Sequence, residues 1–205
     1  MTTKAKPPKK GHYHHGDLRA ALVQATRELV EEHGPEGFSV AQACRIAGVS
    51  TAAPYRHFDT KQDMLDAVAE DGMERMEAKM ARYAAAHPPG TLDAVSAIGK
   101  AYVDFAIEEQ GVFRLMFTEF RNSARQEDLA AKGRRCKMIV DREVARHLDR
   151  DPNDPEVFRV SMMLWTIVHG LSFLAIDGKL GVMDMPIDLD AMIRETGARI
   201  LGVRA

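Results

Sequence analysis

The chain has 205 residues, of which 45% are hydrophobic and 28% are charged, and its formal net charge is −2 at pH 7; this suits one ordinary domain, or a small domain fused to a larger one. Two cysteines, Cys44 and Cys136, exclude a disulfide framework and a zinc site of cysteine pairs, and the longest apolar run, 164–176, is too short for a bilayer span. Because the chain as a whole is not basic, any nucleic-acid surface has to be local, and we expect a cytoplasmic protein with no membrane segment.

Residues 1–12 are expected to form a disordered basic arm, because Pro7 and Pro8 oppose helix and nothing apolar is available for packing. Such an arm can follow the backbone or the minor groove of DNA. The alternative is a metal site made by the neighbouring cluster His12, His14, His15 and Asp17. A structural metal site usually has four ligands, and the sequence has no second group of ligands to complete this cluster. We therefore expect no metal and no cofactor.

Helix caps and breaks organise the rest of the chain. Asp17 is expected to cap a first helix, which stops at Gly34 and Pro35. Ser39 is expected to cap a helix at 40–47, and Asp59 or Thr60 is expected to cap a helix at 61–87. The other helices are expected at 51–57, 91–109, 111–118, 123–148, 155–176 and 187–202. No run has the alternating period of a strand. We therefore predict an all-α protein, in which a three-helix N-terminal domain (13–60) is joined by a long helix to a helical body (61–205).

Residues 38–58 have the pattern of a helix-turn-helix, in which two short helices flank Gly48. Glycine suits the left-handed turn, and Ser50 can cap the second helix. That helix would present Thr51 and Ala52 to base edges, and later donors to phosphates. The residues expected to contact DNA are Ser39, Arg45, Ser50, Thr51, Ala52, Tyr55, Arg56, His57 and Lys61.

This segment resembles the signature of the tetracycline-repressor (TetR) family. The resemblance rests on Gly37-Phe38, Ala47-Gly48-Val49-Ser50, Tyr55-Arg56-His57-Phe58 and Lys61, and it departs from the family pattern at Ala43 and Ile46. The chain also resembles one branch of this family. That resemblance rests on residues 13–19 and 52–55 and on the spacing of Trp165, His169 and Gly170. The resemblance implies a homodimer that reads a palindromic operator on double-stranded DNA. It also implies a repressor that leaves its operator when its body binds a small-molecule effector.

The body has many large apolar residues, for which core packing is the simpler interpretation. The alternative is an adaptable pocket for an apolar ligand, because methionine and aromatic side chains suit such ligands. The pocket candidates are Phe105, Phe113, Met116, Phe117, Met162, Trp165 and His169. His169, four residues after Trp165, is either a ligand contact or a core histidine that fixes a helix contact.

The last two expected helices have broad apolar faces, which favour a four-helix contact between two subunits. The residues expected in this dimer interface are Leu164, Val168, Leu171, Leu174, Ala175, Met192, Ile193, Ile200 and Leu201. The alternative is that these residues are buried within one subunit.

Two other functions are alternatives to a transcriptional regulator: an enzyme, and a helical small-molecule-binding or interaction protein without DNA recognition. The sequence has no glycine-rich phosphate loop, no His-Glu-x-x-His and no nucleophile elbow. We therefore expect a DNA-binding regulator and no enzyme.

Overall fold

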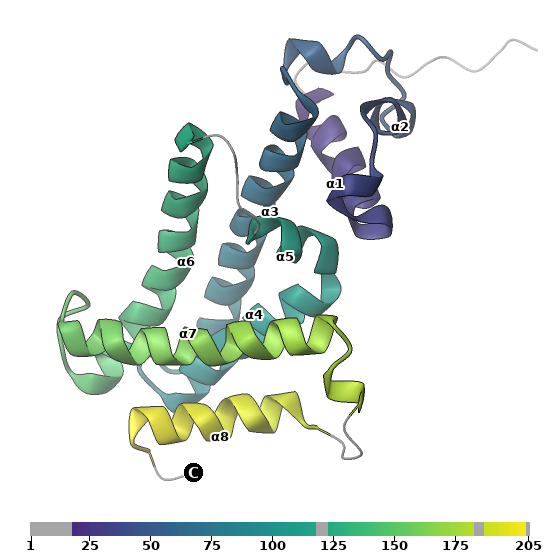
Figure 1. Ribbon diagram of the computed structural model, residues 1–205. Coiled ribbons are helices and arrows are strands. Elements are labelled where there is room, and N and C mark those ends of the chain that lie inside the picture. The colour runs from purple at the N-terminus through teal and green to yellow at the C-terminus, as the bar shows by residue number, and fades with distance from the viewer. Residues whose placement is uncertain (1–17, 118–122, 183–186, 204–205) are drawn as a thin grey trace, which may run out of the picture.

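The computed structural model describes residues 18–117, 123–182 and 187–203. These residues form eight α-helices and two 3-10 helices, and no strand occurs among them. A small group of helices at one end, the head, leads through a long helix into a larger body (Figure 1). The expected all-α architecture is confirmed, while the predicted arm, the histidine cluster and the Asp17 cap lie outside the described residues.

The head begins with α1 (Leu18–Gly37) and α2 (Val40–Ile46). The predicted stop at Gly34 is a kink with φ 72°, after which one further helical turn begins with Pro35. Proline fits there because the first turn of a helix needs no N–H from it. The predicted cap of α2 is confirmed, since the Ser39 hydroxyl accepts from the backbone N–H of Gln42 at 3.2 Å.

The third helix differs from the prediction. Only Pro54–Arg56 is helical, as the 3-10 helix η1, whose N-cap is Ala53, and no side chain caps it. The expected cap by Ser50 is not made; its carbonyl instead accepts from the N–H of Ala53 at 3.0 Å. Proline has no N–H to give to the carbonyl four residues earlier, so an α-helix that starts at Thr51 would lack a bond where it needs one.

Helix α3 (Lys61–Ala84) connects the head to the body (Figure 1). Thr60 caps it, accepting from the N–H of Asp63 at 3.1 Å, while the Asp63 carboxylate accepts from the N–H of Thr60 at 2.9 Å. The largest core cluster runs without a break from Leu22 in α1 through α3 to Cys136. Head and body therefore share one hydrophobic interior.

The body consists of α4 (Leu92–Glu108), α5 (Gln110–Met116), α6 (Ser123–Leu148), α7 (Pro155–Ile176), η2 (Leu180–Val182) and α8 (Leu189–Leu201). Helix α6 runs alongside α3, and α7 and α8 lie side by side across the end of the body (Figure 1). The central α4 packs against α3, α7 and α8.

Helix α7 has 22 residues and, with a mean hydropathy of 1.5, is long and apolar enough to cross a membrane. The apolar run is longer than expected because Val157, Val160 and their neighbours extend it. Here α7 packs against α4, α6 and α8, and core helices of water-soluble proteins have the same composition, so α7 is weak evidence for a membrane span.

Candidate nucleic-acid interface and effector cavity

The turn between α2 and η1 is built as a helix-turn-helix. Gly48 adopts φ 69°, the left-handed conformation predicted for it, and the Val49 N–H bonds to the carbonyl of Cys44 at 2.9 Å. Small buried residues on the inner face let α2 approach its neighbours: Ala43, Cys44 and Ala47. Phe38 and Phe58 are also buried and hold the turn on the core.

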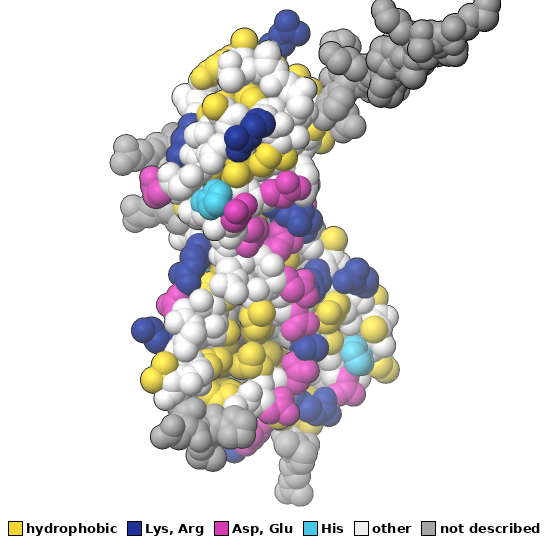
Figure 2. All heavy atoms as spheres, turned by 90° about the vertical axis from the view of Figure 1, so that its right-hand side faces the viewer, with side chains coloured by type: hydrophobic (Ala, Val, Ile, Leu, Met, Phe, Trp, Pro, Cys, Tyr) yellow, Lys and Arg dark blue, Asp and Glu magenta, His cyan; other side chains and the backbone are white. Residues whose placement is uncertain are grey.

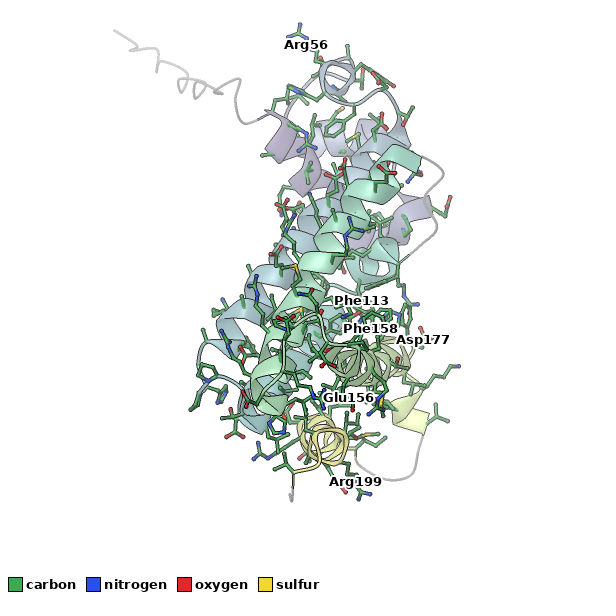
Figure 3. All side chains as sticks on the ribbon, turned by 90° about the vertical axis from the view of Figure 1, so that its left-hand side faces the viewer. Arg56, Phe113, Glu156, Phe158, Asp177 and Arg199 are labelled. Atoms are coloured by element: carbon green, nitrogen blue, oxygen red, sulfur yellow. The ribbon has the colours of Figure 1, made fainter. Side chains whose placement is uncertain are left out.

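Beyond this support, the side chains of the turn face solvent. Tyr55 is 63% exposed although its ring is large and apolar. Arg56 projects from the tip of the head, away from the body (Figure 3). The other expected contacts with exposed side chains are Arg45, Ser50, Thr51, Ala52 and His57. The head thus brings together a compact set of hydroxyl and cationic groups that nothing in the described chain covers.

The two remaining expected contacts already have partners within the head. The Ser39 hydroxyl is the cap of α2. The Lys61 ammonium lies 4.8 Å from the centre of the Phe38 ring and donates to the carbonyl of Glu36 at 3.4 Å. Both residues lie at the edge of the exposed turn and help to fix it.

A cavity of about 320 Å³ lies in the body between α3, α6 and α7. Among the expected pocket residues, Phe117, Met162 and Trp165 line it. Three methionines of α3 also line the cavity and had not been predicted: Met73, Met76 and Met80. Their helical spacing is the signal that could have found them. The lining further includes Tyr102, Arg134, Cys136, Lys137, Val140 and Ser161.

Three expected pocket residues fill the core instead: Phe105, Phe113 and Met116 are each at most 2% exposed and none lines the cavity. Phe113 is at the centre of an aromatic cluster, with ring centroids 5.6 Å from Tyr102, 5.0 Å from Phe117 and 5.4 Å from Phe173. The large residues of α5 are buried because this short helix packs against α1, α3 and α4.

His169 lies behind the cavity wall and has a defined hydrogen-bond chain. The Trp165 N–H donates to the Tyr102 hydroxyl at 3.3 Å, and that hydroxyl lies 2.9 Å from Nδ1 of His169. Since indole can only donate, the Tyr102 O–H is left to donate to Nδ1. Burial lowers the pKa of His169 and raises the pKa of Tyr102, which keeps both groups neutral.

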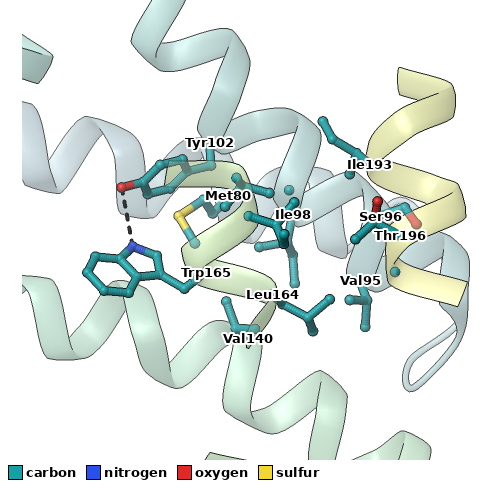
Figure 4. Close-up of a pocket in the computed structure, with 14 residues that line it drawn as sticks. Met80, Val95, Ser96, Ile98, Tyr102, Val140, Leu164, Trp165, Ile193 and Thr196 are labelled. Atoms are coloured by element: carbon teal, nitrogen blue, oxygen red, sulfur yellow. Dashed lines mark hydrogen bonds between the residues drawn. The ribbon is translucent and has the colours of Figure 1, made fainter. Parts of the chain in front are cut away.

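A second, smaller cleft of about 40 Å³ lies between α4, α7 and α8. It shares four lining residues with the cavity, namely Met80, Tyr102, Val140 and Trp165, and the Trp165–Tyr102 bond belongs to this common wall (Figure 4). The cavity is therefore separated from the α7–α8 side of the molecule by one layer of side chains.

The sequence matches two family profiles. Residues 22–68 match "Bacterial regulatory proteins, tetR family", and residues 95–199 match "Tetracyclin repressor-like, C-terminal domain". The chain belongs to the TetR family of transcriptional regulators. The regulator's N-terminal match contains the helix-turn-helix, so DNA binding belongs to this head; members of the family are generally non-enzymatic.

Solved structures share the regulator's fold. A protein of unknown function from Rhodococcus sp. RHA1 has a TM-score of 0.78 and 28% identity, over 94% of this chain and 98% of that one. The TetR-family regulator PfmR of Thermus thermophilus has a TM-score of 0.64 and 17% identity, over 89% and 97% of the two chains. FadR of Bacillus subtilis, solved with stearoyl-CoA, has a TM-score of 0.66 and 14% identity, over 91% and 99%.

A curated relative is the nucleoid occlusion factor SlmA of Mannheimia succiniciproducens. It is 32% identical over 110 residues, which make up 51% of this chain and 50% of that protein. The regulator thus matches about half the length of this relative.

Helix α5 of the regulator joins the aromatic cluster to the head. The Glu31 carboxylate of α1 accepts from the N–H groups of Gly111 and Val112 at 3.1 and 2.7 Å, and so caps the first turn of α5. A Cβ on Gly111 would lie 2.5 Å from the carbonyl oxygen of Val30, so only glycine lets α5 come this close. At the same end, Arg75 donates to Glu109 at 2.7 Å.

The outward face of α7 and α8 is apolar but differs from the predicted set. Leu171, Ile193 and Leu201 are buried within the subunit, because α7 and α8 use these positions to pack on α4 and on each other. Leu164, Val168, Ala175 and Ile200 are half-buried. Of the predicted residues, Leu174 and Met192 are exposed, each by 42%. Met163 and Ile167, which had not been predicted for this face, are 42% and 37% exposed. Figure 2 shows hydrophobic side chains gathered on one surface of the body below the head.

In the described parts of the regulator, no three histidine, cysteine or acidic side chains come together as metal ligands could. The two described cysteines are buried thiols. Burial raises the pKa of Cys136 to about 12, so its thiol is protonated at neutral pH and is a poor metal ligand.

Proposed function

We propose that this TetR-family regulator is a cytoplasmic homodimeric repressor that leaves a palindromic operator when a small apolar effector occupies its body. The proposed roles follow the predicted domains. Residues 1–12 are the arm, 13–60 form the DNA-binding head, and 61–205 form the body that binds the effector and the second subunit. The observation that carries the proposal is the exposed polar turn from Ser50 to His57 on a rigid, buried support.

In the proposed complex, the turn enters the major groove. Thr51 and Ala52 contact base edges, because they are exposed at the start of the reading segment. Tyr55, Arg56 and His57 donate to phosphates, with Arg45 on the preceding helix. Ser39 and Lys61 contact the DNA at the edge of this surface.

One head makes few contacts, so useful specificity requires two heads on successive grooves, roughly 34–36 Å apart or a multiple of it. The exposed apolar face of α7 and α8 is the proposed dimer interface, with Met163, Ile167, Leu174 and Met192 at its centre. Ile167→Glu should therefore give monomers in sedimentation at micromolar concentration, and a wild-type monomer would contradict this part of the proposal.

The proposed effector site is the cavity between α3, α6 and α7, whose volume of about 320 Å³ lies near the lower end of the roughly 300–1,000 Å³ common for ligand pockets. FadR of Bacillus subtilis, which has the same fold, was solved with stearoyl-CoA, and this supports an effector with an apolar part.

Selection of bound duplexes from a random pool tests the DNA proposal. A palindromic consensus is expected, and binding to it should weaken steeply with salt. Arg56→Ala should weaken binding to all duplexes about equally, whereas changes at Thr51 should alter the preferred sequence. Recovery of no consensus would refute sequence-specific binding.

A further inference from the structure

Among the described residues, the lining of the effector cavity has cationic groups and no anionic group. Arg134 and Lys137 of α6 line it, and no described aspartate or glutamate does. Lys137 is already neutralised, because its ammonium lies 2.7 and 2.8 Å from the two carboxylate oxygens of Asp141. Arg134 has no hydrogen bond or ion pair with any residue that the structure describes.

Two cations close to Arg134 in the sequence of α6 are paired with carboxylates of α3. Lys132 pairs with Glu74 at 2.8 Å and Arg135 pairs with Glu77 at 2.8 Å, both across to α3. Arg134 faces the other side, where its exposed guanidinium stands at the rim of an apolar cavity. A guanidinium in this position favours a carboxylate more than any neutral group.

In the lining of the same cavity, the Ser161 hydroxyl has no hydrogen-bond partner although the residue is 1% exposed. Serine and threonine within a helix usually bond back to the carbonyl four residues earlier. On this same helix, Ser172 donates to Val168 and Thr166 donates to Met162, each at 2.8 Å. Ser161 is therefore a buried polar group that a ligand oxygen could satisfy.

We propose that the cavity binds an elongated aliphatic carboxylate that also carries an oxygen function on its chain. The carboxylate pairs with Arg134 at the rim, the chain lies among the thioethers and rings of Met73, Met76 and Trp165, and the chain oxygen meets Ser161. Unbranched chains fit because methionine side chains adapt to irregular apolar shapes. This inference rests on the proposed function only in that the same cavity is the effector site.

Trp165 is the only tryptophan of the chain and lines the cavity, so its fluorescence reports occupancy directly. The probes are dodecanoate, dodecanol and dodecylamine, each kept below its micelle concentration. Dodecanoate should bind at least tenfold more tightly than either of the others. Arg134→Gln should weaken the binding of dodecanoate by about tenfold and leave the binding of dodecanol unchanged. The control is Arg142→Gln, on the same helix but outside the lining, which should change neither affinity.

A second comparison tests the interior end. With 12-hydroxydodecanoate the affinity should exceed that for dodecanoate several-fold, and Ser161→Ala should abolish the difference. Equal affinities for dodecanoate and dodecanol in the wild type, or equal losses of both in Arg134→Gln, would overturn the proposed carboxylate. An unchanged preference for the hydroxylated acid in Ser161→Ala would overturn the role of Ser161.

Duplex binding is measured on the same samples without probe. If the wild type binds probes as expected but selects no DNA sequence, the proposed function fails and the cavity assignment stands. If it selects a DNA sequence but its Trp165 fluorescence does not change when dodecanoate is added, the cavity assignment fails and the proposed DNA binding stands.

Discussion

The head and the body of this regulator use side chains in opposite ways. In the head, the groups proposed to act on DNA are exposed, and the elements beneath them are fixed by local caps and buried aromatic rings. In the body, the proposed effector site is a gap in packing, bordered by the same methionine and aromatic residues that form the core. The head can therefore change specificity without loss of stability, whereas changes of specificity in the body alter the stability of the fold.

The strongest test of this contrast is Phe113→Ala. Phe113 is fully buried, and removal of a core phenylalanine costs about 3–5 kcal/mol of unfolding free energy. Urea unfolding of the variant should show a loss of this size, together with weaker DNA binding because α5 supports α1. A loss below about 1 kcal/mol would mean that the aromatic cluster is not part of the core.

The opposite outcome is expected for Tyr55→Ala in the head. Its exposed side chain should contribute within about 0.5 kcal/mol to stability, while loss of one hydrogen bond to a charged phosphate should weaken operator binding by about tenfold or more. Fluorescence anisotropy on the selected duplex measures this. Equal affinity of variant and wild type would remove Tyr55 from the DNA surface.

The sequence was most informative where structure is local. The caps at Ser39 and Thr60 and the left-handed Gly48 follow from residue types within a few positions of one another, and all three were predicted. The third helix was predicted to start at Thr51 with Pro54 in its first turn, but helix begins only at Pro54, because proline has no N–H for the bond to the carbonyl four residues earlier.

The cavity and the outer face could be predicted only in part, because both depend on how separate helices pack. An apolar position on α7 can point at α4, into a cavity or outward, and periodicity alone does not distinguish the three. Leu171 and Leu174 illustrate this, since they are adjacent in the same pattern yet are 4% and 42% exposed. Arg134 and Ser161 gave no sequence signal, because a lone cation or hydroxyl becomes informative only when its neighbours are known.

The link between head and body can be weakened at Glu31. Glu31→Gln keeps the shape of the side chain but removes the charge that caps α5, so stability should fall by about 1 kcal/mol. The matched control is Glu32→Gln, since the Glu32 side chain is 72% exposed and should matter little. Equal urea midpoints for both variants would argue against a capping role.

Two buried serines on α7 should respond with opposite sign. Ser161→Ala removes an unpartnered hydroxyl and should stabilise the unliganded protein by up to about 1 kcal/mol, whereas Ser172→Ala loses a made bond and should destabilise it by a similar amount. Thermal unfolding measures both. A destabilised Ser161→Ala variant would show that its hydroxyl has a partner.

The smallest effect is expected from pH. Burial lowers the pKa of His169 below its ordinary 6.5, so the unfolded chain takes up this proton first as the pH falls. Stability due to a neutral His169 is thus complete above about pH 6.5 and decreases below it. Between about pH 8 and pH 5.5, the wild type should lose more unfolding free energy than His169→Gln; a larger loss in the variant would reverse the sign of this argument.

The unbroken core from Leu22 to Cys136 has a consequence for how the chain comes apart. Since the inner faces of α1 and α3 contribute to the same interior as α6, no seam of weak contacts separates a reading unit from a sensing unit. The molecule should melt in a single cooperative step, and a severed N-terminal fragment would leave the inner faces of α1 and α3 in water.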